Sequence, residues 1–256
     1  MKHKTVMLYK YPEYFARFYD TIYHSIRDEV DNDYWLKQVL AAKGHVLEAG
    51  VGTGRLFMNS LERGADVFGL DISENMLNIL YRKLPENQRF RISQQSIVDF
   101  IYDFDFSLVI APFRVMMHLV EKDEQLAALN NICKHLEPGG KFIFDTFVPD
   151  LNQLLKGLDN LLQFEGEYEP GRKVRRYVST KPDLINQLIN IDFHLEWEEN
   201  DGIHHEDWAV PMRFYFRYEL EHLIERSDFS KYDIYGDFAG SELNKDSKEF
   251  VAVCRK

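Results

Sequence analysis

Short apolar runs alternate with amphipathic stretches between residues 45 and 145 of the chain. The run at residues 106–110 is almost continuously apolar, which is typical of a strand buried on both faces. Residues 126–136 instead carry apolar side chains at helical spacing. Regular alternation of strand and helix predicts an α/β fold, in which a doubly wound parallel sheet has helices on both faces. The predicted strands are residues 45–48, 65–71, 90–92, 106–110 and 141–144, and the predicted helices are residues 14–42, 56–63, 73–84 and 126–136.

The pattern changes to a period of two residues after Pro149. Apolar and polar residues alternate over 189–197, which predicts a strand with one wet face. Asn200-Asp201-Gly202 is a hairpin signal, so a return strand is expected over 203–215. Residues 173–179 predict a third antiparallel strand. The expected organisation is one domain of residues 1–150 and 216–256, with an antiparallel β insertion at 151–215, a helix at 218–226 and strands at 232–235 and 250–254.

Composition and charge narrow the class of protein. The 256 residues include 31 lysines and arginines against 42 aspartates and glutamates, for a net charge of −11. This acidic balance disfavours a nucleic-acid partner, because phosphates are held by basic surfaces. Hydrophobic residues make up 45% and charged residues 29%, which excludes wholesale disorder. No apolar stretch approaches the roughly 18 residues that span a bilayer, so no membrane contact is expected.

Cysteine usage indicates a reducing compartment. Cys133 and Cys254 are too few for a disulfide framework and have no CxxC spacing. Residues 1–11 contain early lysines but no apolar core like that of a signal peptide. We therefore expect a cytoplasmic protein.

Three glycines, Gly50, Gly52 and Gly54, stand between the first predicted strand and a helix. Glycine permits the tight turn and lets the backbone approach a ligand closely. Asp71 closes the next strand about 20 residues later, where an acid can take both hydroxyls of a ribose. Together these features predict an adenosine-type cofactor.

Two cofactors compete for this geometry. The dinucleotide fingerprint is GxGxxG, whereas the spacing here is GxGxG and residue 55 is arginine. Glu48 precedes the first glycine by two residues and would repel a pyrophosphate. A ligand with a positive centre, such as a sulfonium, suits it better. The residues therefore favour S-adenosylmethionine over NAD.

Four segments resemble the motifs of class I S-adenosylmethionine-dependent methyltransferases, in the order in which that family carries them. The resemblance covers about residues 45–145 and implies a Rossmann-like methyltransferase sheet that is mostly parallel. The segments are 46–56 (VLEAGVGTGRL), 69–77 (GLDISENML), 106–113 (FSLVIAPF) and 136–145 (LEPGGKFIFD).

The resemblance implies a role for each matching residue. Family members usually have an acid after the third strand that receives the adenine amino group, whereas Ser96 stands there with Ile97 beside it. Ser96, Gln95 or Asp99 would then accept that hydrogen bond. The implied cofactor site comprises Glu48, Gly50, Gly52 and Gly54 at the methionine part, Arg55 at its carboxylate, Asp71 at the ribose, and Ile72, Met76, Ser96 and Ile97 at the adenine.

Residues 111–114 follow the fourth predicted strand and are expected to face the transferable methyl, because ligands bind beyond the carboxyl ends of such strands. Ala111 and Phe113 therefore join the predicted cofactor site. Tyr19 and Asp20 resemble a tyrosine–aspartate pair of small-molecule members, in which the N-terminal segment covers the cofactor.

Methyl transfer from a sulfonium is an in-line displacement, so placement of the reactants supplies most of the catalysis. An amine acceptor needs a dry pocket and loss of its proton, whereas a hydroxyl acceptor needs a base. His118 is the candidate base, and its alternative is to pack or cap the following helix. Arg114 would orient an acidic group of the substrate or bridge surface carboxylates.

Other clusters have simpler interpretations. Tyrosines 9, 11, 14, 19 and 23 would form a cation-attracting lid or pack their rings on the sheet, and packing is the simpler interpretation for most of them. The segment 204–207 (HHED) puts only two candidate ligands on each face of a strand, too few for zinc, so no metal is expected. The basic residues at 172–176 are interpreted as a wet strand surface.

The sequence thus predicts an S-adenosylmethionine-dependent methyltransferase whose insertion covers the pocket of a small-molecule acceptor, with nitrogen as the expected acceptor atom. Three alternatives stay open: a non-catalytic S-adenosylmethionine-binding protein, an RNA or protein methyltransferase, and an NAD-dependent oxidoreductase. An exposed edge of the insertion can pair between subunits, which makes a homodimer a further expectation.

Overall fold

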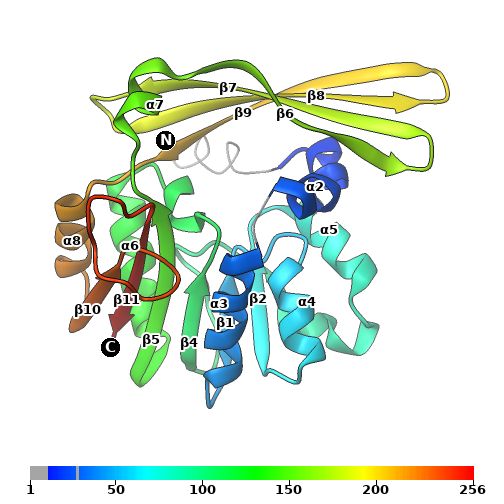
Figure 1. Cartoon of the computed structure of the whole chain (residues 1–256). Helices are drawn as coiled ribbons and strands as arrows, with labels where there is room; N and C mark the ends of the chain where they lie inside the picture. The colour runs from blue at the N-terminus through cyan, green and yellow to red at the C-terminus, as the bar shows by residue number, and fades with distance from the viewer. Residues whose placement is uncertain (1–10, 27–28) are drawn as a thin grey trace.

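The computed structural model describes residues 11–26 and 29–256. Figure 1 shows two sheets, a main sheet with helices on both faces and an antiparallel sheet above it, with α2 (Glu13–Ile26) between them at one end. Among the helices within these ranges, none is long and apolar enough to cross a membrane.

The main sheet has seven strands in the order β10-β11-β5-β4-β1-β2-β3. The five strands from β5 to β3 are parallel to their neighbours, while β11 and β10 are antiparallel additions at one edge. The predicted α/β fold with a mostly parallel sheet is therefore confirmed. The strands are β1 (Val46–Ala49), β2 (Val67–Asp71), β3 (Ile92–Gln94), β4 (Phe106–Ala111), β5 (Leu136–Phe147), β10 (Lys231–Tyr235) and β11 (Glu249–Arg255).

Helices cover both faces of this sheet because successive residues of each strand point to opposite sides. Trp35 and Leu77 pack on one face, and Ile132 and Ile224 pack on the other. The helices of the first face are α3 (Glu29–Ala41), α4 (Arg55–Glu62) and α5 (Glu74–Lys83), and those of the second are α6 (Lys122–Lys134) and α8 (Arg217–Glu225).

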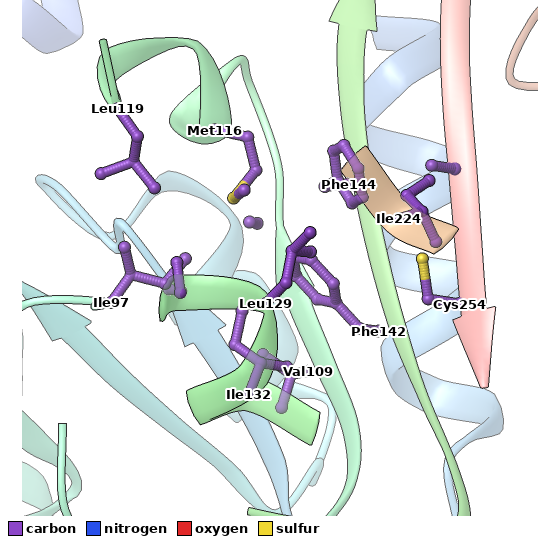
Figure 2. Packing of buried hydrophobic residues seen from close by; sticks show 14 of the residues in the cluster. Ile97, Val109, Met116, Leu119, Leu129, Ile132, Phe142, Phe144, Ile224 and Cys254 are labelled. Atoms are coloured by element: carbon purple, nitrogen blue, oxygen red, sulfur yellow. The ribbon is translucent and has the colours of Figure 1, made fainter. Parts of the chain in front are cut away.

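The core of the second face is closely filled. Figure 2 shows Leu129 and Ile132 of α6 beside Val109 of β4, and Ile224 of α8 beside Phe144 of β5. All five side chains are almost completely buried. This packing holds the carboxyl ends of the parallel strands rigidly, and the loops that follow them carry the site described below.

The antiparallel sheet contains four strands in the order β6-β7-β8-β9. Its inner face packs on α2, where Phe15 and Phe18 meet Phe193 and Trp197 of β8. The strands are β6 (Leu158–Glu169), β7 (Arg172–Asp183), β8 (Leu188–Glu199) and β9 (Gly202–Arg213), and a short helix α7 (Leu151–Lys156) precedes them.

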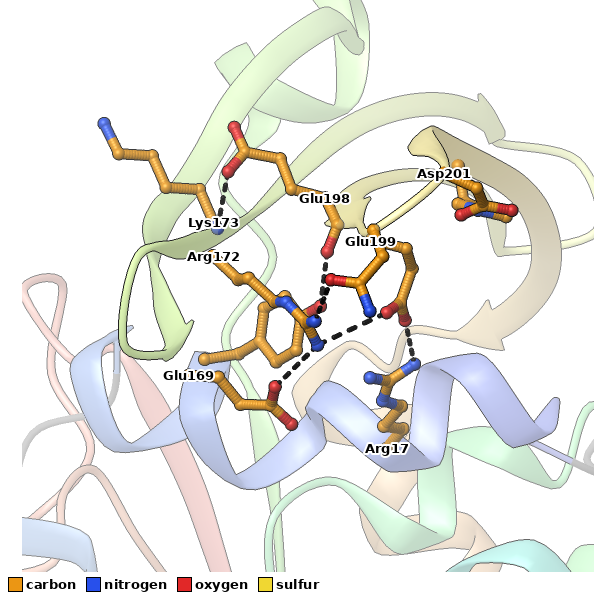
Figure 3. Close-up of polar contacts among 10 residues, drawn as sticks. Arg17, Glu169, Arg172, Lys173, Glu198, Glu199 and Asp201 are labelled. Carbon is orange, nitrogen blue, oxygen red and sulfur yellow. Dashed lines mark hydrogen bonds and ion pairs between the residues drawn. The ribbon is translucent and has the colours of Figure 1, made fainter.

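Charged residues at the hairpin ends fasten this sheet to α2. Figure 3 shows Arg17 of α2 paired with Glu199, which Arg172 also approaches while it pairs with Glu169. Such exposed pairs contribute little energy individually, but they add direction to the apolar packing of α2 beneath the sheet.

Two predicted boundaries were wrong, and one strand was missed. Phe90 belongs to the 3-10 helix η1 (Glu86–Arg91), so β3 begins only at Ile92. Leu136 opens β5 instead of ending α6, because it pairs with Phe106 of β4 ahead of the register shift that lies between Phe106 and Leu108. The strand β6 was missed, since its apolar residues do not alternate and its pairing with β7 is interrupted by several irregularities.

Candidate cofactor-binding site

A cavity lies at the carboxyl ends of β1, β2, β3 and β4 and beneath α2. Twelve residues that the sequence placed at the cofactor or the methyl acceptor line it, whereas Gly54, Ala111 and Arg114 are not among its lining residues. The twelve are Tyr19, Glu48, Gly50, Gly52, Arg55, Asp71, Ile72, Met76, Ser96, Ile97, Phe113 and His118.

The glycine loop between β1 and α4 needs its glycines. Gly50 has a φ of 75°, and a Cβ there would come within 2.4 Å of Val115. Gly54 has a φ of 85°, and its Cβ would come within 2.3 Å of Leu80 on α5. Gly50 therefore serves the cavity, while Gly54 serves the packing of the loop on α5.

Asp71, at the end of β2, is held by backbone donors. The amide of Gly52 donates to one carboxylate oxygen at 2.9 Å, and the amide of Ser73 donates to the other at 2.8 Å. Burial raises the pKa of Asp71, and the backbone hydrogen bonds from Ser73 and Gly52 oppose that rise. The carboxylate is thereby fixed in the cavity wall and still has lone pairs for two hydroxyl donors.

Glu48 is a buried acid in the same wall. Its side chain is 2% exposed, and its Oε2 accepts no hydrogen bond from any described residue. Burial raises the pKa of Glu48 to about 8; nearby Arg55 opposes the rise and Asp71 adds to it. A buried carboxyl with an unsatisfied oxygen is costly, so this position favours a ligand that brings a positive charge.

Arg55, which follows the glycine loop, and Phe113, which follows β4, contact each other in the cavity wall. The guanidinium of Arg55 lies 3.9 Å from the ring centroid of Phe113, within the range of a cation–π contact. Phe113 has a φ of 60°, a strained conformation for a non-glycine residue. The strain indicates that the loop after β4 is held in place by its surroundings.

At the predicted adenine end, the candidate acceptors for the adenine amino group are Ser96, Gln95 and Asp99. Ser96 lines the cavity, and its hydroxyl accepts a hydrogen bond from the amide of Val98 at 3.2 Å. Gln95 also lines the cavity, but its side chain bonds to Ser93 and Ile101. Asp99 is not among the lining residues.

Glu124, in the first turn of α6, also lines the cavity. Its Oε2 is buried without a hydrogen-bond partner among the described residues, and burial raises its pKa. The sequence analysis missed Glu124 because it stands in a helix, and only the tertiary fold brings it to the cavity. An acid at the start of the helix after the fourth strand was the only available signal.

His118 ends the 3-10 helix η2 (Val115–His118) and lines the cavity. The ring of Tyr11 meets its imidazole edge to face, with centroids 6.3 Å apart. Burial lowers the pKa of His118 to about 4, so the imidazole is neutral at pH 7. A neutral imidazole can accept a proton.

Arg114 lies outside the cavity lining and has protein partners. Its guanidinium pairs with Asp145 of β5 and with Glu249 of β11, and burial of Asp145 is almost complete at 1% exposure. The residue has a φ of 75° at the start of η2, which turns its side chain toward β5. Of its two sequence interpretations, the structure favours the one in which Arg114 bridges carboxylates.

The remaining clusters lie elsewhere. His204 contacts Asp201, and His194 contacts Asp207 on the antiparallel sheet. Within residues 11–26 and 29–256, no group of three His, Cys, Asp or Glu residues could hold a metal ion. Tyr9 lies outside the described residues, whereas Tyr11 and Tyr19 line the cavity.

Known proteins are similar to this chain in sequence and in fold. A methyltransferase-domain family matches residues 46–140. An uncharacterized methyltransferase of Bacillus thuringiensis (strain Al Hakam) is 30% identical over 196 residues, which are 76% of this chain and 80% of that protein. The alignment with YqeM of Bacillus subtilis is 26% identical over 129 residues, 49% of this chain, and spans about half (52%) of that protein.

Solved structures agree at the level of the fold. An S-adenosylmethionine-dependent methyltransferase from Clostridium acetobutylicum superposes with a TM-score of 0.72 at 18% identity, over 94% of this chain and 97% of that one. The sugar N-methyltransferase KedS8 from Streptoalloteichus superposes with a TM-score of 0.73 at 19% identity, over 93% of each chain. The chain belongs to the S-adenosylmethionine-dependent methyltransferases, which removes the NAD-dependent oxidoreductase from consideration.

Proposed function

We propose that this cavity binds S-adenosylmethionine and that the chain methylates a nitrogen atom of a small molecule. The observation that carries the proposal is Glu48, a buried carboxyl in the cavity wall with one oxygen unsatisfied among the described residues. The ammonium and sulfonium groups of S-adenosylmethionine supply the positive charge that this position lacks.

Each end of the cavity suits one part of that cofactor. Asp71 takes the ribose hydroxyls, because its backbone hydrogen bonds orient both carboxylate oxygens. Ile72 and Met76 offer an apolar surface for the adenine ring. We assign the adenine amino group to Glu124, because its Oε2 is buried without a partner among the described residues, whereas the hydroxyl of Ser96 already accepts one hydrogen bond from Val98.

Bound S-adenosylmethionine supplies an electrophilic methyl group on a sulfonium. The chain's own contribution is to position the acceptor and to exclude water, and proximity of this kind contributes up to about 7–11 kcal/mol. Neutral His118 takes the proton that the acceptor amine loses and passes it on to solvent, because its own pKa of about 4 is too low to keep that proton. We also propose that the antiparallel sheet with α2 closes the acceptor side of the cavity.

Proteins of similar fold that are described as N-methyltransferases or as an amino pentose methyltransferase support a nitrogen acceptor. KedS8 is described as a sugar N-methyltransferase, CalS10 from Micromonospora echinaspora as an amino pentose methyltransferase and MtfA as a glycopeptide N-methyltransferase. An RNA or protein acceptor has less support, because the net charge of −11 disfavours a nucleic-acid surface.

The first test is a thermal melt with S-adenosylmethionine, its demethylated product S-adenosylhomocysteine and NAD in parallel. At 100 times its dissociation constant a ligand adds about 2.7 kcal/mol. Each kcal/mol raises the midpoint by about 2–4 °C in a chain of this size. We expect both adenosyl ligands to raise the midpoint and NAD to leave it unchanged.

A matched pair of variants on β2 locates the binding. Asp71→Asn is expected to abolish the shift, whereas Asp66→Asn, before the other end of the same strand, is expected to keep it. Methyl transfer to a panel of small amines then separates an enzyme from a non-catalytic binding protein. A shift without turnover of any amine, alcohol or macromolecule would favour the binding protein.

Location and assembly extend the proposal. Cys133 and Cys254 are both buried free thiols, which suits the reducing cytoplasm. The edge strand β6 exposes Leu161 and Leu162, and pairing of two such edges would form a homodimer. Sedimentation of the wild type and of Leu161→Lys tests this assembly, because a dimer through β6 would dissociate in the variant.

A further inference from the structure

Arg176 is a buried cation in the middle of β7. Only 1% of it is exposed, and its Nε and Nη1 atoms have no hydrogen-bond partner within residues 11–26 and 29–256. It points to the inner face of the antiparallel sheet, toward α2, together with Val174 and Val178. Fully buried arginines are rare unless they are paired, so this one requires a physical explanation.

The surroundings of Arg176 are aromatic and apolar. Its partners across the neighbouring strands are Phe164 on β6 and Leu195 on β8. Its guanidinium carbon lies 4.7 Å from the ring centroid of Tyr23 and 5.2 Å from that of Phe193. Ring faces attract the charge, but they do not replace a carboxylate as hydrogen-bond acceptor for two N–H groups.

The adjacent Arg175 has the ion pairs that are typical of an arginine with a structural role. It faces the outer side of the sheet and pairs with Glu165 and Glu196. Arg172, at the start of β7, likewise pairs with Glu169 and Glu199 (Figure 3). Arg176 differs from both because it is buried and no ion pair joins it to a carboxylate of the residues that the structure describes.

Energetics argue against a purely structural role. Burying a charge without its partner is costly, and an apolar side chain of similar volume would pack among these rings with less penalty. A buried arginine that lowers the stability of the free protein is expected where a bound ligand supplies the negative charge that the guanidinium lacks. The unsatisfied donors Nε and Nη1 each belong to one of the two forks that a guanidinium offers to a carboxylate or a phosphate, and Nη2 is the second donor of both.

The position also connects to the cofactor cavity. The ring of Tyr23, beneath the guanidinium, stacks on the ring of Tyr19 with centroids 4.2 Å apart. Tyr19 lines the cavity, so Arg176 stands two ring layers behind its wall. A ligand group bound there would lie on the side of the cavity that the antiparallel sheet covers.

We propose that Arg176 binds an oxyanion carried by the methyl acceptor, in the layer between α2 and the antiparallel sheet. The inference rests on the proposed function and narrows its substrate class. The acceptor is an amine that also carries a carboxylate or a phosphate, separated from its nitrogen by several bonds. The chain would thus recognise its two ligands by opposite charges, with Glu48 at the cationic cofactor and Arg176 at the anionic end of the acceptor.

The test is a thermal melt in sodium acetate, sodium phosphate and sodium chloride at equal ionic strength, without S-adenosylmethionine. We expect acetate or phosphate to raise the midpoint saturably, by about 3–5 °C at ten times the dissociation constant. The anion with the larger saturable effect identifies the group as a carboxylate or a phosphate. Equal midpoints in all three salts would overturn the proposal without any variant.

Variants assign the effect to the residue. Arg176→Met is expected to lose the saturable rise and to be at least as stable as the wild type in chloride, because it removes an unpaired buried charge. Arg175→Met, on the outer face, is expected to keep the rise. A general salt effect would persist in both variants and would not saturate. Arg176→Lys keeps the charge without the fork and is expected to bind the anion more weakly.

The outcomes separate this inference from the proposed function. Arg176→Met is expected to keep its thermal shift with S-adenosylmethionine, because the residue lies outside the cofactor cavity. A wild type that responds to anions but not to S-adenosylmethionine would contradict the proposed function and leave an oxyanion site. A variant Arg176→Met that retains the saturable anion effect would overturn the role of Arg176.

Discussion

The hydroxyl of Thr53 donates a hydrogen bond of 2.6 Å to the carboxylate of Asp20, which joins the glycine loop to α2. Lys83 of α5 donates to the same carboxylate at 2.5 Å and to the carbonyl oxygen of Thr53 at 2.9 Å. Three elements of the cavity therefore share one polar junction. The helix that covers the cofactor cavity is coupled to the loop that forms its floor.

Asp20→Ala should weaken the binding of S-adenosylmethionine by loosening α2 over the cavity. A hydrogen bond contributes about 1 kcal/mol net, so we expect about a fivefold to tenfold higher dissociation constant. Titration calorimetry measures it, and Glu13→Ala, exposed on the same helix, serves as the control. Equal affinities of the two variants would show that the junction does not matter for binding.

The pH dependence of Glu48 is a second prediction. Between its ordinary value of 4.5 and its raised pKa of about 8, the folded protein holds a proton that the unfolded chain has lost. The free energy of unfolding without ligand should therefore fall as the pH rises through this interval. Urea denaturation from pH 5 to pH 9 measures the slope, and Glu48→Gln should flatten it.

Ligand binding should show the opposite trend. A cationic ligand favours the ionised carboxylate, so S-adenosylmethionine should release a proton from Glu48 when it binds below pH 8. Its affinity should rise with pH up to about pH 8, by up to about tenfold per unit. Calorimetry in two buffers of different ionisation enthalpy counts that proton. No proton release at pH 7 would contradict the assignment of Glu48 to the cation.

The cofactor side of the site was largely predictable from the sequence, because its geometry is local. Gly50 and Gly52 impose a turn, Glu48 precedes it in the same strand, and Asp71 ends the next parallel strand beside it. These positions depend on backbone conformation and on strand order. Both leave strong signals in a short stretch of sequence.

The residues whose surroundings the sequence left open or predicted wrongly depend on contacts between distant segments. Arg114 finds its partners 31 and 135 residues away, in strands whose neighbours only the folded sheet defines. The interpretation of Arg176 as part of a wet strand surface is wrong, because the residue is buried among rings from α2 and β8 that nothing in its own strand reveals. Periodicity predicts which face a side chain takes, but not which side chain it meets there.

His118 provides a fourth prediction through its pH profile. Burial lowers its pKa to about 4, so it stays neutral between pH 5 and pH 8. The profile of kcat/KM should show no step near pH 6.5 from this residue, and His118→Ala should lower kcat by about 100-fold or more if it receives the acceptor's proton. His222→Ala, exposed on α8, is the control. An unchanged kcat in His118→Ala would reject the role of base.

Arg114→Met separates a structural role from a role at the substrate. Removing this guanidinium takes away the cation that pairs with both the buried carboxylate of Asp145 and the carboxylate of Glu249. Breaking such a buried pair costs about 3–5 kcal/mol, which urea denaturation measures directly. Arg217→Met, which breaks an exposed pair with Glu221 one helical turn away, should change stability little.

Compensating changes sharpen this test. Asp145→Asn and Glu249→Gln remove the repelling charges, so adding them to Arg114→Met should restore part of the lost stability. A residue that bound the acceptor would behave differently, because its loss would raise the KM for the acceptor and leave the urea midpoint in place. Since both carboxylates converge on one guanidinium, we expect the loss of stability and its partial rescue.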